Sequence, residues 1–278
     1  MINVLIPTDF SENAWNAIDY GIQFFQEEFV NFYLLHVSFF DRPEATRNAV
    51  SNSVVFDFSS TINVEENLEE TLSRIEQTHS RDNHKFYALQ EQSLFIDAIK
   101  RTVDKRKIDF ILMGTKGASG LKEVTIGTQT GEVITRVKCP TLVVPEHAVY
   151  KKPENLVFPT DFNSYYKDKV LTTLSGIMWM NRAKLHILHV TKKNHELSPI
   201  QNENKEFLDN FLMDKPHMFH FIANRDMENA LAAIIDDAGI DMITMVAKNV
   251  NFFQRLFFKP SVAKISYHTR IPFLVLHE

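Results

Sequence analysis

The segment NVLIPTDF at positions 3–10 returns as NLVFPTDF at positions 155–162. Each copy is a short apolar run ending in Pro-Thr-Asp, which is typical of a buried strand that leads into a polar loop. Three further segments recur in the same order: LLHV at 34–37 as ILHV at 187–190, IDFI at 108–111 as IDMI at 240–243, and CPTLVVP at 139–145 as IPFLVLH at 271–277. Four matches in one order predict two tandem copies of one domain.

The length of the chain agrees with this division. Its 278 residues suffice for two domains in the common size range of about 100–150 residues. A polar joint that contains a proline, HAVYKKPE, lies at 147–154. We therefore expect one domain at 1–147 and a second at 153–278.

Short apolar runs alternate with helical patterns within each copy. In the first copy the apolar runs predict strands at 2–7, 32–38, 85–90, 108–114 and 140–145. Between them the spacing predicts a helix after Ser11, which suits an N-cap, and further helices at 64–80, at 93–106 and after Gly127. Strands separated by helices imply a mostly parallel five-stranded sheet in each domain, with helices on both faces. The fold class is thus α/β, with two tandem Rossmann-like domains.

Glycines are concentrated in one place. Five of the eight lie between positions 114 and 131, after the apolar run FILM at 110–113 and around the start of the expected helix. Glycine exposes backbone N–H groups without a Cβ, and a helix N-terminus adds unpaired N–H groups that favour an anion. The stretch therefore predicts a phosphate-binding loop, with Thr128 and Thr130 as hydroxyl donors. Turn formation alone is the simpler alternative.

Two common nucleotide motifs are absent. Leu121 follows Gly120, so no G-x-x-x-x-G-K-[ST] motif forms, and Pro7-Thr8-Asp9 stands where a dinucleotide site would have G-x-G-x-x-G. The sequence supports neither a P-loop NTPase nor an NAD-type site.

The combined pattern resembles the universal stress protein family. Nucleotide-binding members carry G-x₂-G-x₉-G-[ST], and Gly114, Gly117, Gly127 and Thr128 match it without a gap. Pro-Thr-Asp after the first strand, His36-Val37 and the segment CPTLVV at 139–144 are also similar to the family. The resemblance covers both halves and implies an adenine nucleotide alpha hydrolase-like form of the Rossmann-like fold.

The resemblance also implies a ligand and its site. ATP, or AMP or ADP in its place, would bind the first domain, with Mg²⁺ able to accompany the phosphates. Asp9 would face the ribose or adenine, and Val37 would contact adenine through its backbone. The implied binding residues are Pro7, Thr8, Asp9, Val37, Met113, Gly114, Thr115, Gly117, Gly127, Thr128, Gln129 and Thr130.

The second copy departs from this motif. Val246 and Asn249 stand at the positions of Gly114 and Gly117, and Lys259 and Pro260 at those of Gly127 and Thr128. Side chains would occupy the approach to phosphate, and proline removes a donor. We expect the second site to be degenerate.

These features favour a stress-response protein that senses or binds a nucleotide. A slow ATP hydrolase is one alternative, because Lys116 and Lys122 lie in the loop. No base is recognisable near Gly127, so we expect no dedicated enzyme activity and no catalytic residue. The other alternative is a nucleotide-independent interaction module that uses the insert at 39–63, a lid or a surface excursion, and the aromatic run NFFQRLFF at 251–258.

Composition limits the partners. The net charge of −5 gives no overall basic field for nucleic acid. The single cysteine, Cys139, fits a reducing compartment, and we do not expect it to act as a nucleophile. Residues 1–10 lack the pattern of a signal peptide, and no apolar run could span a bilayer, so we expect a cytoplasmic protein without membrane contact.

Two predictions concern assembly and metal. The last strands of the two copies, 140–145 and 272–277, are expected to pair within the chain as an internal pseudo-dimer, since their edges would otherwise be exposed. A further homodimer and an unidentified protein partner remain alternatives. His186 and His189, three apart in a strand, point to opposite faces and predict no shared metal.

Overall fold

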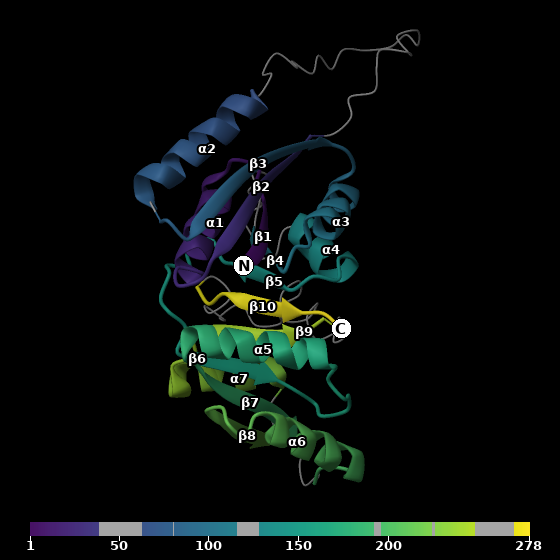
Figure 1. Cartoon of the computed structure of the whole chain (residues 1–278). Coiled ribbons are helices and arrows are strands. Elements are labelled where there is room, and N and C mark those ends of the chain that lie inside the picture. Colours follow the sequence, from purple (N-terminus) through teal and green to yellow (C-terminus); the bar gives the residue numbers. More distant parts are fainter. Residues whose placement is uncertain (39–62, 80, 116–127, 192–195, 224–225, 248–269) are drawn as a thin grey trace, which may run out of the picture.

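One continuous sheet organises the molecule. The computed structural model describes residues 1–38, 63–79, 81–115, 128–191, 196–223, 226–247 and 270–278. Within these ranges all strands join a 10-stranded sheet in the order β3-β2-β1-β4-β5-β10-β9-β6-β7-β8 (Figure 1). The first five strands in this order come from the first half of the chain and the others from the second half, so the predicted class of two tandem Rossmann-like domains is confirmed.

The first half alternates strands and helices as predicted. Its elements are β1 (Ile2–Pro7), α1 (Glu12–Phe24), β2 (Val30–Ser38), α2 (Val64–Thr78), β3 (His84–Gln92), α3 (Phe95–Arg106), β4 (Phe110–Gly114), α4 (Thr128–Arg136) and β5 (Thr141–Val144). Ser11 is the N-cap of α1, and its side chain accepts a hydrogen bond from the Ala14 N–H, as its residue type indicates.

The second half repeats the pattern with fewer helices in the described ranges. Its elements are β6 (Asn155–Pro159), α5 (Asp168–Asn181), β7 (Lys184–Thr191), α6 (Pro199–Phe211), β8 (His217–Ala223), α7 (Met227–Ala238), β9 (Met242–Val246) and β10 (Phe273–Leu276). The repeated Ile-Asp pair has a structural role in both halves. Asp109 accepts from the Asn3 N–H at 2.8 Å, and Asp241 accepts from the Asn155 N–H at 3.0 Å, so each anchors the start of a first strand.

Alternating side chains fill the two faces of the sheet. In β1, Val4 and Ile6 pack with α1 and α2, whereas Leu5 packs with α3 and α4. Both faces are therefore covered, which is why the parallel strands read as continuous apolar runs.

The two halves meet through their last strands. β5 and β10 pair antiparallel, with Leu142 opposite Leu274, as predicted for these strands. One core cluster contains residues of both halves, including Leu142 and Leu276, and Tyr150 of the joint packs edge-on against Tyr20 at 5.3 Å. The halves therefore share a hydrophobic core as well as a sheet.

The insert at 39–63, apart from its last residue, and the aromatic run at 251–258 lie outside the described residues. Among the helices that the structure does describe, none combines the length and the apolar character that crossing a bilayer requires.

Candidate functional site

The carboxyl ends of three neighbouring strands form one edge in the first half. β1 pairs in parallel with β2, where Pro7 lies opposite Leu35, and with β4, where Leu5 lies opposite Ile111. The residues that follow these strands are therefore neighbours at a single edge. This edge brings together the Pro7–Asp9 loop, the end of β2 around Val37 and the end of β4 at Gly114.

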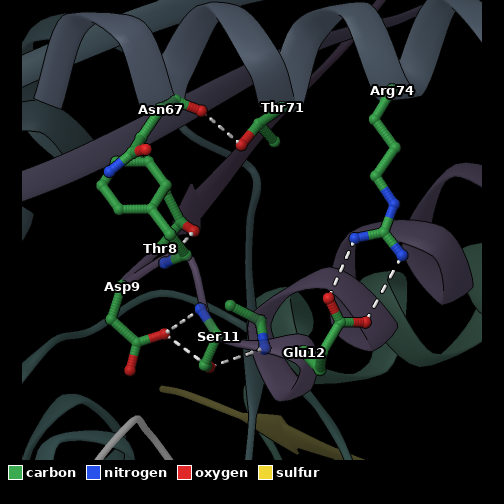
Figure 2. Close-up of polar contacts among 9 residues, drawn as sticks. Thr8, Asp9, Ser11, Glu12, Asn67, Thr71 and Arg74 are labelled. Carbon is green, nitrogen blue, oxygen red and sulfur yellow. Dashed lines mark hydrogen bonds and ion pairs between the residues drawn. The ribbon is translucent and has the colours of Figure 1, made fainter. Parts of the chain in front are cut away.

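Hydrogen bonds within the loop after β1, and one to β2, hold this loop in one conformation. The Thr8 N–H donates to the Leu35 carbonyl at 2.9 Å, and the Thr8 hydroxyl accepts from the Phe10 N–H at 3.1 Å. The Asp9 carboxylate accepts from the Ser11 N–H at 3.1 Å and from the Ser11 hydroxyl at 2.6 Å (Figure 2). These bonds orient the Asp9 carboxylate at the start of α1.

Phe10 and His36 belong to this edge, and the motif comparison did not include them as site residues. Phe10 has a left-handed backbone, with φ of 64°, and its ring stacks on His36 at 4.7 Å. The His36 Nδ1 lies 2.9 Å from the Thr8 carbonyl. Because a carbonyl only accepts, Nδ1 is the protonated nitrogen. Both residues recur in the second copy, as Phe162 and His189. This repetition is the sequence feature that could have identified them as part of the edge.

The end of β4 is tied to α4. The Thr115 N–H donates to the Val144 carbonyl at 3.1 Å, and the buried Thr130 hydroxyl donates to the Gly114 carbonyl at 2.8 Å. A hydroxyl has a single proton, so in this conformation Thr130 cannot also donate to phosphate. Thr130 therefore positions α4 against Gly114 in this conformation, and its expected role as a phosphate donor stays a prediction.

The remaining motif residues divide into three groups. Met113 is buried in the core and Val37 is partly buried against it, so each would offer its backbone to a ligand. Gln129 is exposed in the first turn of α4, which begins at Thr128. Gly117 and Gly127 lie outside the described residues.

Helix α2 crosses above the start of α1 (Figure 2). The Arg74 guanidinium donates to both carboxylate oxygens of Glu12, at 3.1 and 3.3 Å, and lies 3.8 Å over the Trp15 ring. This hydrogen bonding holds the pKa of Glu12 below its ordinary value. Arg74 thus joins α2 to α1 beside the candidate site.

Comparison with known proteins identifies the family. The family model described as the universal stress protein family matches residues 1–145. This chain belongs to the universal stress protein family. A universal stress protein of Methanocaldococcus jannaschii is 27% identical over 156 residues, covering 54% of this chain and 82% of that protein.

Solved structures extend the similarity to the second half. The crystal structure of a universal stress protein from Archaeoglobus fulgidus has a TM-score of 0.69 at 17% identity, covering 99% of this chain and 96% of that one. A functionally unknown protein from Pseudomonas aeruginosa has a TM-score of 0.56 at 10% identity, covering 99% and 92%. At such low sequence identities, this structural similarity establishes the fold alone. It shows that both halves of this universal stress protein share the fold of these structures.

At the corresponding edge of the second half of this universal stress protein, a buried side chain stands in the place of Gly114. Val246, at the end of β9, takes the position of Gly114 and is buried in the core. The next residue, Ala247, donates to the Leu276 carbonyl at 2.8 Å, as Thr115 does to Val144, so the correspondence between the two strand ends is structural. Asn249, Lys259 and Pro260 lie outside the described residues.

Helix α6 closes over the second Pro-Thr-Asp-Phe loop. The Gln201 amide donates to the Asp161 carbonyl and the Asn204 amide to the Phe162 carbonyl, each at 2.7 Å, and Phe162 is fully buried. Helix α2 carries Glu66 and Glu69 at the same distances from its N-cap. Ionised carboxylates cannot donate, so α2 cannot close the first loop in this way.

The two histidines of β7, His186 and His189, have structural partners in this universal stress protein. His189 Nδ1 lies 2.8 Å from the Thr160 carbonyl, repeating the contact of His36. His186 pairs instead with His220 on the adjacent strand, at 2.9 Å between ring nitrogens, and burial lowers the pKa of His186 to about 4. Within the described ranges no group of three or more His, Cys, Asp or Glu could hold a metal ion.

Cys139 is buried in the core beside Ile108, which follows α3. Its thiol lies 3.6 Å from the Ile108 carbonyl, and burial raises the pKa of the thiol to about 12. Such a thiol is protonated at neutral pH, which does not favour a nucleophilic role.

Proposed function

We propose that this universal stress protein is a cytoplasmic sensing or binding module that takes one adenine nucleotide, ATP or its mono- or diphosphate, in the domain at 1–147. The observation that carries the proposal is the difference between the two equivalent edges. The first edge ends in Gly114 and continues into the glycine motif, whereas the second ends in the buried Val246 and lies under α6.

The described residues suit the two ends of a nucleotide. The edge offers backbone groups at Val37 and Gly114, the oriented Asp9 carboxylate for a ribose hydroxyl, and the N-terminus of α4 for phosphate. Thr8, Pro7, Met113, Thr115 and Gln129 would line the same space. When bound, Mg²⁺ would neutralise phosphate charge, and Gly117, Gly127 and Thr128 would complete the loop by the family pattern.

Binding is the better proposal than turnover. A backbone cradle binds ground-state and transition-state phosphates with similar strength, which gives affinity without much acceleration. His36, the histidine in the described part of this edge, is hydrogen-bonded to the Thr8 carbonyl through Nδ1. Asp9, placed by the family pattern, would lie at the nucleoside end of the ligand and not beside the terminal phosphate. We therefore expect phosphate release at saturating ATP and Mg²⁺ far below the ~10 s⁻¹ of typical enzymes.

Calorimetry on a matched pair of variants tests the site. Wild type should bind one nucleotide per chain. Gly117→Val should lower the affinity at least about 100-fold, because a branched side chain would occupy the approach of phosphate. Asn249→Val, the same substitution at the corresponding position of the second copy, should leave binding unchanged.

Gly114→Val offers an independent arm of the test. The second half already accommodates valine at this position within the same fold, so the variant should fold and yet lose nucleotide. Two equivalent sites per chain, or equal losses in Gly117→Val and Asn249→Val, would contradict the proposal. A phosphate release rate above about 1 s⁻¹ that disappears in Gly117→Val would instead identify a hydrolase.

A further inference from the structure

A groove lies at the seam between the two halves, away from the candidate nucleotide edge. Its walls come from the turn after α1, the C-terminal part of α5 and the turn before β8, and it holds about 520 Å³. We call it the seam groove and define it by Glu27, Glu28, Trp179, Arg182 and Lys215. It adjoins the core that the two halves share, because Met178 lines it and also belongs to that core.

Large apolar side chains stand exposed around the seam groove. Trp179 is 79% exposed, and Phe29 and Met213, each next in sequence to a groove residue, are 64% and 74% exposed. Aromatic residues and methionine are enriched in protein interfaces relative to the rest of the surface. Three such residues at one place indicate a surface that a protein covers.

Helix α5 presents an unusual outer face beside the groove. From Val170 to Asn181 it contains no charged residue, although Thr172, Gly176 and Trp179 are exposed on one side. A Cβ added at Gly176 would meet nothing within 4 Å, so the backbone is open to close approach. Ser175 lines the groove, and its hydroxyl is buried without a hydrogen-bond partner among the described residues.

The two walls of the groove carry opposite charges. Glu27 and Glu28 form the wall from the first half, and Arg182 and Lys215 stand on the wall from the second half, where Asp214 is also present. Glu27 is already paired with Lys152 at 2.9 Å and is attracted to Arg182 of the same chain, which leaves Glu28 as the acidic group for a partner. A two-fold axis through the groove would place the acidic wall of one copy on the basic wall of another, twice. Such self-complementarity is what an isologous interface requires.

We propose that the seam groove is the interface for a second copy of this chain. In the dimer, Trp179 of each copy occupies the groove of the other, and Glu28 of each copy lies against Arg182 of the other. The central β5–β10 pairing stays within one chain, so this contact joins two complete tandem proteins. The proposal does not depend on nucleotide binding.

Sedimentation velocity over a concentration series tests the contact on the full chain. Wild type should show a monomer–dimer equilibrium, and Trp179→Ala should raise the dissociation constant at least about tenfold, since buried tryptophans dominate such interfaces. Ile200→Ala, which removes another largely exposed apolar side chain, on α6, is the matched control and should have no effect. In a Trp15→Phe background, Trp179 emission should shift to the blue as the concentration rises.

Charge reversal identifies the occupant. Glu28→Lys and Arg182→Glu should each weaken association by at least about tenfold, because each creates like-charge contacts across the axis. An equimolar mixture of the two variants should associate as tightly as wild type, since each mixed dimer has one original and one reversed pair. An ion pair inside one chain, or a site for a different molecule, would not give this recovery.

A monomer at every attainable concentration would overturn the proposal. A dimer that is insensitive to Trp179→Ala and to both charge reversals would place the interface elsewhere and would overturn it as well. Circular dichroism of each variant establishes that the fold is retained, as expected for residues at the surface.

Discussion

His277 is a buried histidine near the seam between the halves. Among the described residues, its Nε2 has no hydrogen-bond partner, and burial together with the cations of Lys169 and Lys138 lowers its pKa to about 4. Between about pH 6.5 and pH 4 the unfolded chain takes up a proton at this position while the folded chain does not. The folded state should therefore lose stability as the pH falls through this range, by at most about 1.4 kcal/mol per pH unit for this group.

Urea unfolding at a series of pH values measures this effect. His277→Leu should reduce the pH dependence below about pH 6.5, because leucine does not titrate. The part due to His186, whose pKa burial also lowers to about 4, should remain. His147→Leu, at an exposed position of the joint, should leave the profile as in wild type. Equal profiles for wild type and His277→Leu would mean that His277 does not bind fewer protons in the folded state.

Among the single elements, helix α2 is held against the rest of the protein by few contacts. It buries only Leu68 and Ile75 among its described residues, and Arg74 joins it to Glu12 and Trp15. The ion pair is largely exposed, so its contribution and that of the ring contact together are about 1 kcal/mol. Arg74→Ala should speed hydrogen exchange of the α2 amides severalfold while global stability changes little.

The conservative variant separates charge from geometry in α2. Arg74→Lys retains the cation but cannot donate to both carboxylate oxygens, so exchange should lie between that of wild type and that of Arg74→Ala. Unchanged exchange in Arg74→Ala would show that packing at Leu68 and Ile75 alone holds α2.

The whole molecule should unfold as one cooperative unit, because one sheet and two core clusters cross the seam. Leu274→Asp, a buried charge opposite Leu142, should lower the free energy of unfolding by about 3–5 kcal/mol. It should also raise hydrogen exchange in α1 of the other half. Val149→Asp, at an exposed position of the joint, is the matched control. Loss of protection confined to the second half would show that the halves unfold independently.

The repeat and the hydrophobic pattern determined most of the fold without tertiary information. Strands β1 to β5, the helix capped by Ser11 and the pairing of the two last strands all follow from local patterns and from the need to cover an edge. These features could be predicted because each depends on neighbouring residues or on burial. Strand starts were less certain, and β4 begins at Phe110 rather than at 108 because Ile108 still donates to Val103 of the preceding helix.

Some features of the candidate site could be predicted from the sequence, and others could be seen only in the tertiary structure. The clustered glycines, together with the resemblance to the family, predicted the phosphate loop and its degeneration in the second copy, because backbone access to phosphate depends on residue type. Only the tertiary structure decided that Thr130 bonds to Gly114, that His186 pairs with His220 and that Phe10 stacks on His36. Each of these partners lies on another element, and their meeting depends on strand register and helix placement. The seam groove likewise exists only because the two halves fold against one another, so no local sequence pattern could have revealed it.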